Sequence, residues 1–163
     1  MAESYSITQQ FILFFHNPIL LSCVFSWIGA QFIKAAIKLI YGRIHSLGEL
    51  IEVMFWRTGG MPSSHSALVT SLCTTIGFRH GIHSDMFIFA LCFFLVVIRD
   101  AFGVRRSSGI QAKKINEIGN ELAEKKVINS YKKMKEVNGH TPMEVLCGCL
   151  LGFFVGLSFC LLK

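Results

Sequence analysis

The sequence places two glycines, a proline, two serines and a histidine close together in residues 59–65. Pro62 predicts the start of a helix, because proline is well tolerated at the first helical position. The free backbone N–H groups of a helix start, together with the helix dipole, bind anions. The hydroxyl groups of Ser63 and Ser64 add donors, and His65 falls within the first turn. The alternative interpretation is a serine-rich helix cap with an incidental histidine.

A second histidine, His140, precedes Glu144 by four residues. On a helix such a pair lies on one face, so the carboxylate can reach the imidazole, fix its tautomer and raise its nucleophilicity. This arrangement is typical of a catalytic histidine. Residues 141–144 (Thr-Pro-Met-Glu) also fit a capping box, in which Glu144 bonds to the backbone at a helix start. The sequence leaves both interpretations open.

Several charged residues stand near these motifs. Arg105 and Arg106 can bind phosphate through paired N–H groups, and Lys34 or Lys38 would add a point charge. Each has an alternative role, because lysines at the end of a membrane helix extend toward water and arginines beside one mark the cytoplasmic side. Asp100 ends an apolar run, where ionisable residues are costly and are paired or functional. We expect Asp100 to orient one of the arginines.

The elements that must position these residues are membrane helices. Of the 163 residues, 52% are hydrophobic and only 16% are charged, whereas a soluble domain has about 25% charged residues. This composition excludes a disordered chain and an ordinary water-soluble enzyme. A membrane span needs roughly 20 residues, and the apolar runs predict four of them. They cover approximately residues 18–40, 62–78, 84–104 and 142–162.

Two connecting segments differ from the spans. Residues 41–61 contain an apolar periodicity at 47–55 that predicts a short interfacial helix. Residues 105–140 hold nine Lys or Arg and four Glu, and predict a solvent-exposed basic amphipathic helix. Its apolar positions are Ile115, Ile118, Leu122 and Ile128. We therefore expect an all-α integral membrane bundle of about four transmembrane helices with a basic helical insertion, forming one domain over residues 1–163.

Small residues within the spans are interpreted as structural. Gly148, Gly152 and Gly156 recur every four residues, which is typical of a helix face that packs closely against another helix. The six cysteines lie in apolar stretches without the spacing of a zinc site or a disulfide framework, so we expect free thiols. No cluster of acids, histidines or thiols has the spacing of a metal cage, so we expect no metal and no cofactor.

The predicted topology brings the polar motifs together. Four spans place both termini on one side and residues 41–61 and 105–140 on the other, and the nine basic residues of the latter predict that this side is cytoplasmic. Basic residues that serve an anionic substrate would imitate this signal. The polar motifs at the ends of all four spans lie at this same membrane face, so we expect one site there. Net charge +6 is compatible with an anionic lipid partner, and we expect no nucleic acid partner.

Four stretches of the sequence resemble the divergent branch of the type-2 phosphatidic acid phosphatase superfamily, which also includes the vanadium haloperoxidases. They are Gly59-Gly60-Met61-Pro62-Ser63-Ser64-His65-Ser66-Ala67, Asp100-Ala101-Phe102-Gly103-Val104-Arg105-Arg106, Gly109-Ile110-Gln111-Ala112 and Gly139-His140-Thr141-Pro142-Met143-Glu144-Val145. The resemblance extends from about residue 18 to residue 160, and the match around His65 is highly specific.

The sequence also departs from the superfamily pattern. Ser64 stands where the Pro-Ser-Gly-His motif has glycine, and Glu144 stands where the His-x-x-x-Asp motif has aspartate. The arginine expected six residues before His140 is replaced by Met134, so Arg105 or Arg106 would have to supply it. The first motif, which pairs a lysine with an arginine, is broken. Its best substitutes are Lys34 and Arg57.

The resemblance implies metal-independent hydrolysis of a phosphate ester in two steps. His140 would attack phosphorus to form a phosphohistidine, Glu144 would orient it, and His65 would protonate the leaving alkoxide. The residues implied to hold the phosphate are Lys34, Arg57, Ser63, Ser64, Arg105 and Arg106. The membrane setting implies a lipid phosphate monoester as the substrate, with its head group at the cytoplasmic face.

Two other functions remain open from the sequence. A non-enzymatic protein could bind or move an anionic lipid with the same cationic pocket, although only an enzyme needs two histidines at one site. A small helical scaffold would explain the glycine face but not the convergence of the polar motifs. Four helices make a thin bundle, and a homodimer is therefore also expected.

Overall fold

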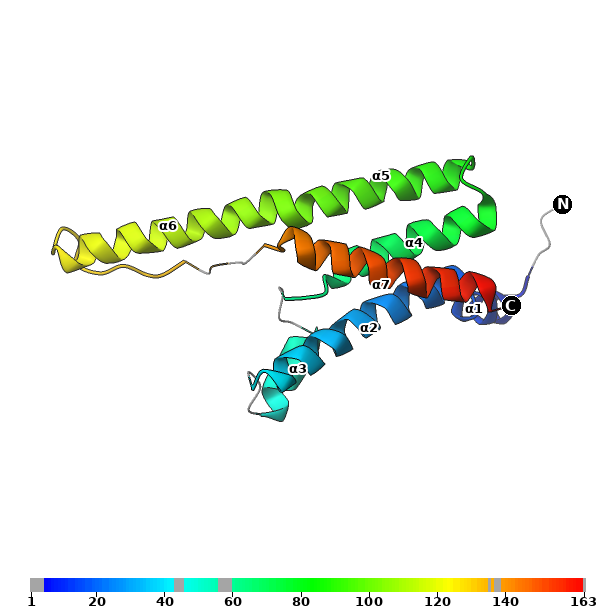
Figure 1. Ribbon diagram of the computed structural model, residues 1–163, viewed down its shortest axis with the longest axis horizontal. Coiled ribbons are helices and arrows are strands. Elements are labelled where there is room, and N and C mark those ends of the chain that lie inside the picture. Colours follow the sequence, from blue (N-terminus) through cyan, green and yellow to red (C-terminus); the bar gives the residue numbers. More distant parts are fainter. Residues whose placement is uncertain (1–4, 43–45, 56–59, 135, 137–138, 163) are drawn as a thin grey trace.

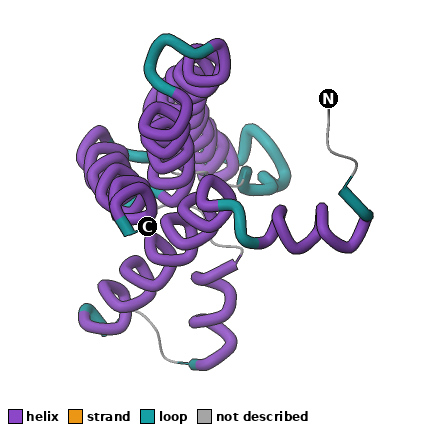
Figure 2. Tube along the Cα trace, turned by 90° about the vertical axis from the view of Figure 1, so that its right-hand side faces the viewer, coloured by secondary structure: helices purple, strands orange, loops and turns teal. Residues whose placement is uncertain are grey.

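The structure is a computed structural model of the 163-residue chain, and it describes residues 5–42, 46–55, 60–134, 136 and 139–162. Within these ranges it contains seven α-helices and one π-helical turn, and no strand (Figure 2). Arg105 is described in its backbone only. This architecture confirms the expected all-α membrane bundle.

Three helices form the core of the bundle. Helices α2 (Pro18–Ile40), α4 (Ser64–His80) and α7 (Pro142–Leu161) all pack against one another, and α4 lies between α2, α5 and α7 (Figure 1). By length and composition, α2 and α7 can each cross a membrane. Helix α1 (Ile7–Phe15) and the end of α7 lie at the same end of the bundle, as an even number of spans requires (Figure 1).

The other two predicted spans are shorter than the first and last. Helix α4 has 17 residues, and many of its Ser, Thr and Ala side chains are buried against neighbouring helices. It therefore does not need an apolar surface on every face. Helix α5 (Asp85–Arg99) has 15 residues and passes directly into the π-helical turn η1 (Asp100–Val104) and then into α6 (Arg105–Glu124). Together they form one long rod in Figure 1. The third predicted span, 84–104, therefore ends inside a continuing helix.

The basic insertion is a helix with an extended return segment. Helix α6 ends at Glu124, and Lys126 has a φ of 55°, a left-handed conformation that terminates helices. Ile128 therefore lies beyond the helix, and its predicted place on the amphipathic face was wrong. The chain then runs back along α6 toward the bundle (Figure 1). The predicted short helix at 47–55 is confirmed as α3 (Leu47–Phe55).

The glycine face of α7 packs directly on the backbone of α4. A Cβ atom on Gly148 would overlap the carbonyl oxygen of Ser63, the cap of α4, and one on Gly152 would overlap that of Ala67 in α4. One on Gly156 would lie 3.0 Å from the Ser71 carbonyl oxygen. All three glycines are buried. The predicted close-packing face is therefore confirmed, and it fixes the first turn of α7 against the first turn of α4.

Candidate functional site

The first turn of α4 begins with a serine cap. The Ser63 Oγ accepts hydrogen bonds from the Ser66 amide at 3.4 Å and from the Ser66 hydroxyl at 2.9 Å. Ser63 is fully buried and Ser64 nearly so. The serine cap is therefore present, but the predicted start of the helix at Pro62 was wrong, because Ser63 is the cap and α4 begins at Ser64. The helix itself supplies no acceptor for the amides of Ser64 and His65, since first-turn N–H groups have no intrahelical partner.

The histidine–glutamate pair lies at the start of α7, where His140 precedes the Thr141 cap and Glu144 is in the first turn. The Nδ1 of His140 lies 2.9 Å from Oε2 of Glu144. The same oxygen accepts the Thr141 amide at 3.2 Å, while the Thr141 hydroxyl accepts the Glu144 amide at 3.3 Å. Both sequence interpretations are thus realised at once: Glu144 completes a capping box and orients the imidazole. With Nδ1–H donating to the carboxylate, the lone pair of the imidazole is on Nε2.

Two backbone hydrogen bonds tie three elements together at this end. The Ser63 amide donates to the Glu144 carbonyl at 2.9 Å, which joins the starts of α4 and α7. The His140 amide donates to the Ala101 carbonyl at 3.2 Å, which joins the lead-in of α7 to η1. A π-turn interrupts the regular backbone ladder of a helix and frees a carbonyl for an outside partner, and such turns are frequent at functional sites. His140 is therefore held by its backbone as well as by its ring.

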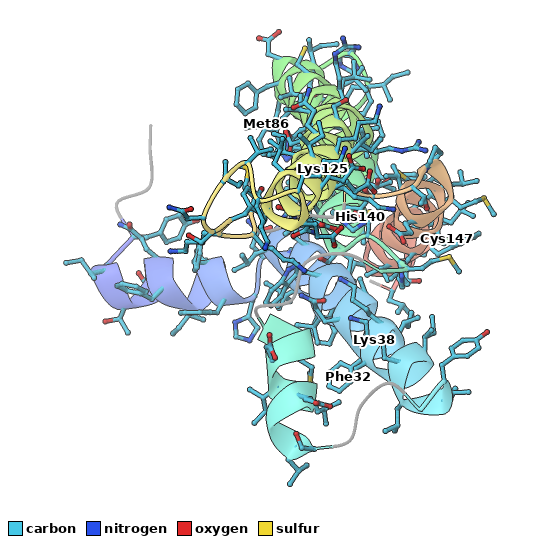
Figure 3. The ribbon with its side chains drawn as sticks, turned by 90° about the vertical axis from the view of Figure 1, so that its left-hand side faces the viewer. Phe32, Lys38, Met86, Lys125, His140 and Cys147 are labelled. Atoms are coloured by element: carbon cyan, nitrogen blue, oxygen red, sulfur yellow. The ribbon has the colours of Figure 1, made fainter. Side chains whose placement is uncertain are left out.

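A cavity of about 230 Å³ lies among these elements. Its polar lining consists of His65 from α4, Asp100 from η1 and His140 from the lead-in of α7. Its volume is several times the roughly 30 Å³ that one water molecule occupies. His140 is only 7% exposed, whereas His65 is exposed. Three residues predicted from separate sequence motifs therefore line one space, and Figure 3 shows His140 near the centre of this end of the molecule.

Lys34 is a buried cation at the same end of the bundle. Its side chain is 2% exposed and lies beside the turn at Gly60, where a Cβ would be 3.6 Å from its Cγ. The charged groups that act on it electrostatically are Lys38 and Glu144. Among the described residues, no side chain or carbonyl forms a hydrogen bond or ion pair with its ammonium group. Because its side chain is buried, the surface-directed alternative for Lys34 was wrong.

The structure does not bring the three predicted arginines to the cavity among the residues that it describes. Arg57 lies outside the described residues, and so does the side chain of Arg105. Arg106 is exposed on the first turn of α6, without an ion pair to any described residue. The prediction that Asp100 orients an arginine stays a prediction, although Asp100 does line the cavity.

Sequence reasoning missed two polar side chains that hold segments leading to the site. Ser66 donates its hydroxyl to the Ser63 cap. Asn116 on α6 donates to the Met134 carbonyl at 3.0 Å and accepts the Met134 amide at 2.8 Å, and so clamps the segment that leads to His140. One signal for Asn116 was present: it lies on a face with Gly109, Ala112 and Gly119, whose small residues allow another chain to approach.

Comparisons with known proteins agree with the motif analysis. A family model described as the divergent PAP2 family matches residues 15–155. The chain is 37% identical over 148 residues to the uncharacterized membrane protein YuiD of Bacillus subtilis (strain 168), an alignment that covers 85% of this chain and 90% of that protein. No solved structure matches the chain.

Proposed function

The protein belongs to the divergent PAP2 family, and from its site geometry we propose that it is a membrane-embedded phosphatase that hydrolyses a lipid phosphate monoester. One observation carries the proposal. Two histidines from different elements line one cavity, and the ring of one of them, His140, is oriented by Glu144. Binding of an anionic lipid alone would need cations, but it would not need an oriented imidazole opposite a second one.

In the first step, the Nε2 lone pair of His140 attacks phosphorus, and the bond between phosphorus and the lipid oxygen breaks. His65, in its imidazolium form, gives its proton to the departing alkoxide. Glu144 stabilises the positive charge that develops on the His140 ring through the bond at Nδ1. The product is a phosphohistidine and a free lipid alcohol.

In the second step, a water molecule attacks the phosphohistidine. His65, now neutral, accepts the proton of this water, and the bond between Nε2 and phosphorus breaks. Inorganic phosphate leaves, and both histidines return to their starting protonation states. The same residue therefore acts as an acid and then as a base, as reversal of the first step requires.

Stabilisation of the phosphoryl oxygens is assigned to the cations and donors around the cavity. Phosphoryl transfer depends mainly on positioning and on stabilising charge. The buried Lys34 supplies a cation close to Glu144, and the first-turn amides of Ser64 and His65 supply donors. The other proposed phosphate ligands are Arg57, Ser63, the hydroxyl of Ser64, Arg105 and Arg106.

The direct test is phosphate release by the purified protein from a panel of lipid phosphates. We expect turnover of at least one lipid phosphate, inhibition by vanadate, which resembles the phosphoryl transition state, and unchanged turnover in EDTA. His140→Ala should abolish the activity. The matched control is His80→Ala, since His80 is exposed at the opposite end of α4. If no lipid phosphate is hydrolysed while lipid phosphates still bind, the protein is an anionic-lipid binder and the enzyme proposal is wrong.

We also propose that the site faces the cytoplasm, because the basic α6 segment extends from the same end of the bundle. Ser107 is exposed on α6, so Ser107→Cys offers an accessible label in a background without other cysteines. We expect an impermeant maleimide to label it only after cells are opened. Labelling of intact cells would show that the topology is inverted.

A further inference from the structure

Helix α1 is almost uncovered by the rest of the protein. All of residues 5–17 are exposed, and the one substantial contact of α1 with another described helix is with α2, which follows it. Six of its nine residues are large and apolar, and each of these six side chains is more than half exposed. Isolated helices shorter than about 12–15 residues are marginal in water. A nine-residue helix with such a surface therefore needs something outside the described chain to cover it.

One face of α1 is continuously apolar. Ile7, Phe11 and Phe14 are spaced at i, i+4 and i+7, so they lie one above another along the helix. With Gln10 they line a hollow of about 340 Å³, to which no other described element contributes. Gln9 lies on the opposite face, since it is about half a turn away from Ile7. Helix α1 is therefore amphipathic, and its apolar face is open.

The polar groups at the two ends of α1 are satisfied by residues of the same segment. The Ser6 hydroxyl accepts the Gln9 amide at 3.3 Å, and the Gln9 side-chain oxygen accepts the Ser6 amide at 3.0 Å. At the other end, the His16 amide donates to the Ile12 carbonyl at 3.1 Å. Because unpaired backbone groups are costly in an apolar medium, this capping suits a helix that is partly withdrawn from water.

The position of α1 indicates which medium covers the open face. Helix α1 is followed by Asn17, the cap of α2, and α2 is long and apolar enough to cross a membrane. Helix α1 therefore lies where a span begins, at the boundary between lipid head groups and hydrocarbon. Figures 2 and 3, which look along the bundle, show α1 extending sideways from it, across the direction of the spans. None of residues 5–17 is Asp, Glu, Lys or Arg, so no charge opposes burial there.

We propose that α1 is an interfacial helix, which lies in the plane of the membrane and inserts its Ile7, Phe11 and Phe14 face into the lipid surface. It does so at the end of the bundle opposite the histidine site. Helices of this kind bury their apolar face roughly 5–10 Å into the boundary between head groups and acyl chains. Because residues 5–17 carry no basic residue, insertion depends on apolar contact and not on the charge of the lipid. The contact fixes the depth at which α2 enters the bilayer, and it does not depend on the phosphatase activity.

The test compares the two faces of α1 in the full chain, with the six native cysteines replaced by alanine. Phe11→Cys reports on the apolar face, and Gln9→Cys is the matched control on the opposite face. Each variant is labelled with a nitrobenzoxadiazole fluorophore and reconstituted into phosphatidylcholine vesicles that contain a doxyl-labelled lipid. We expect the doxyl lipid to quench the label at position 11 at least about threefold more than the label at position 9. Iodide in the water should quench the two labels in the reverse order.

Two results would overturn the proposal. Equal quenching of both labels by the doxyl lipid would show that α1 has no lipid-facing side. Protection of position 11 from iodide without quenching by the doxyl lipid would show that protein, such as a second copy of this chain, covers the face. Vesicles that also contain phosphatidylglycerol should give the same ratio. A ratio that appears only with this anionic lipid would show that charge and not apolar insertion holds α1 at the membrane.

A second measurement tests whether lipid stabilises the helix. Phe11→Asp places a carboxylate on the apolar face, and Gln9→Asp places the same group on the opposite face. Because a helix of this length is marginal without its lipid contact, the amides of residues 11–15 should exchange about tenfold faster in Phe11→Asp. In Gln9→Asp they should exchange at the wild-type rate. Hydrogen exchange with mass spectrometry in the same vesicles measures both, and an unchanged rate in Phe11→Asp would reject the interfacial helix.

Discussion

Helix α4 is packed in opposite ways on its two sides. Against α7 it forms direct backbone contact, because three glycines of α7 leave no room for side chains between the helices. Against α5 the packing is loose: Ala90 is the one residue that is buried among those described for α5, and two cavities open along this side. The same helix thus has a close interface and an open one.

The difference separates two tasks that an active site must perform. Glu144 belongs to the close interface, where the Ser63–Glu144 backbone bond and the glycine contacts hold the start of α7, and Glu144 in turn holds the His140 ring, which lines the histidine cavity. Reacting groups lose rate when they are displaced by even an ångström, so a rigid interface suits them. For the lipid substrate proposed above, the open interface offers cavities that already exist. The predictions below test whether the two sides are as distinct as the packing indicates.

The largest effect is expected from the two histidines, and the leaving group distinguishes their roles. His140→Ala should lower turnover at least about 1,000-fold for every ester, because no nucleophile remains. His65→Ala should cost about 100- to 10,000-fold for an alkyl phosphate, which needs an acid. It should cost much less for p-nitrophenyl phosphate, whose leaving group departs without a proton. Steady-state kinetics with both substrates measures this, and equal losses for His65→Ala on both would reject its role as the acid.

The close interface should show the next largest effect, on stability. Gly152→Ala forces a methyl group toward the Ala67 carbonyl of α4, and overpacking of this kind costs about 1–3 kcal/mol. Gly29→Ala on α2 is the control, since no atom lies within 4 Å of the new methyl group. It should be neutral or stabilising by about 0.5–1 kcal/mol, as alanine is favoured over glycine in helices. Thermal unfolding in detergent measures both, and equal stabilities would show that α4 and α7 are not in close contact.

The sequence predicts most of the fold because its signals are local. Asn17 and Thr141 cap helices that begin with proline, so the starts of α2 and α7 follow from neighbouring residues. The end of the third span could not be predicted in this way. No proline interrupts residues 99–106, and the helix continues through a π-turn whose position depends on tertiary contacts such as the His140–Ala101 bond.

In the candidate site, too, contacts between neighbours in the sequence can be predicted and contacts between distant residues cannot. The spacing of His140 and Glu144 predicts their contact because His140 directly precedes the Thr141 cap and Glu144 lies in the first turn of α7. The burial of Lys34 does not follow from its sequence, since a lysine near a span end can extend to the surface or be covered. The turn at Gly60, distant in the sequence, covers it. The clamp of Asn116 on Met134 likewise joins residues that only the return of the chain brings together.

A smaller effect on turnover should distinguish the bond between the Glu144 carboxylate and His140 from the bond between the Glu144 amide and the Thr141 hydroxyl. Glu144→Gln keeps an oxygen near His140 but removes the charge that stabilises an imidazolium, so turnover should fall about 10- to 100-fold, the range found for carboxylates that orient metal-bound histidines. Thr141→Val removes the cap that accepts the Glu144 amide. It should lower stability by about 1 kcal/mol with turnover near that of the wild type. If the two variants lose the same turnover, Glu144 acts only as part of the cap.

The smallest effect is expected in the α6 arm, which is remote from both sides of α4. Asn116→Leu removes all four hydrogen bonds of the Asn116 amide, which bind Met134 twice and also involve Tyr131 and Glu136. The return segment should then exchange its amide hydrogens faster, most clearly at Met134, and hydrogen exchange with mass spectrometry measures this. Turnover should fall only about two- to fivefold, equivalent to ~0.5–1 kcal/mol. The loss stays small because Ala101 and Glu144 still hold His140.

Asn120→Leu on the same helix is the control and should change neither quantity. If Asn116→Leu lowered turnover as much as Glu144→Gln, the arm would be part of the machinery that positions His140, and the division of tasks between the two sides of α4 would be incomplete.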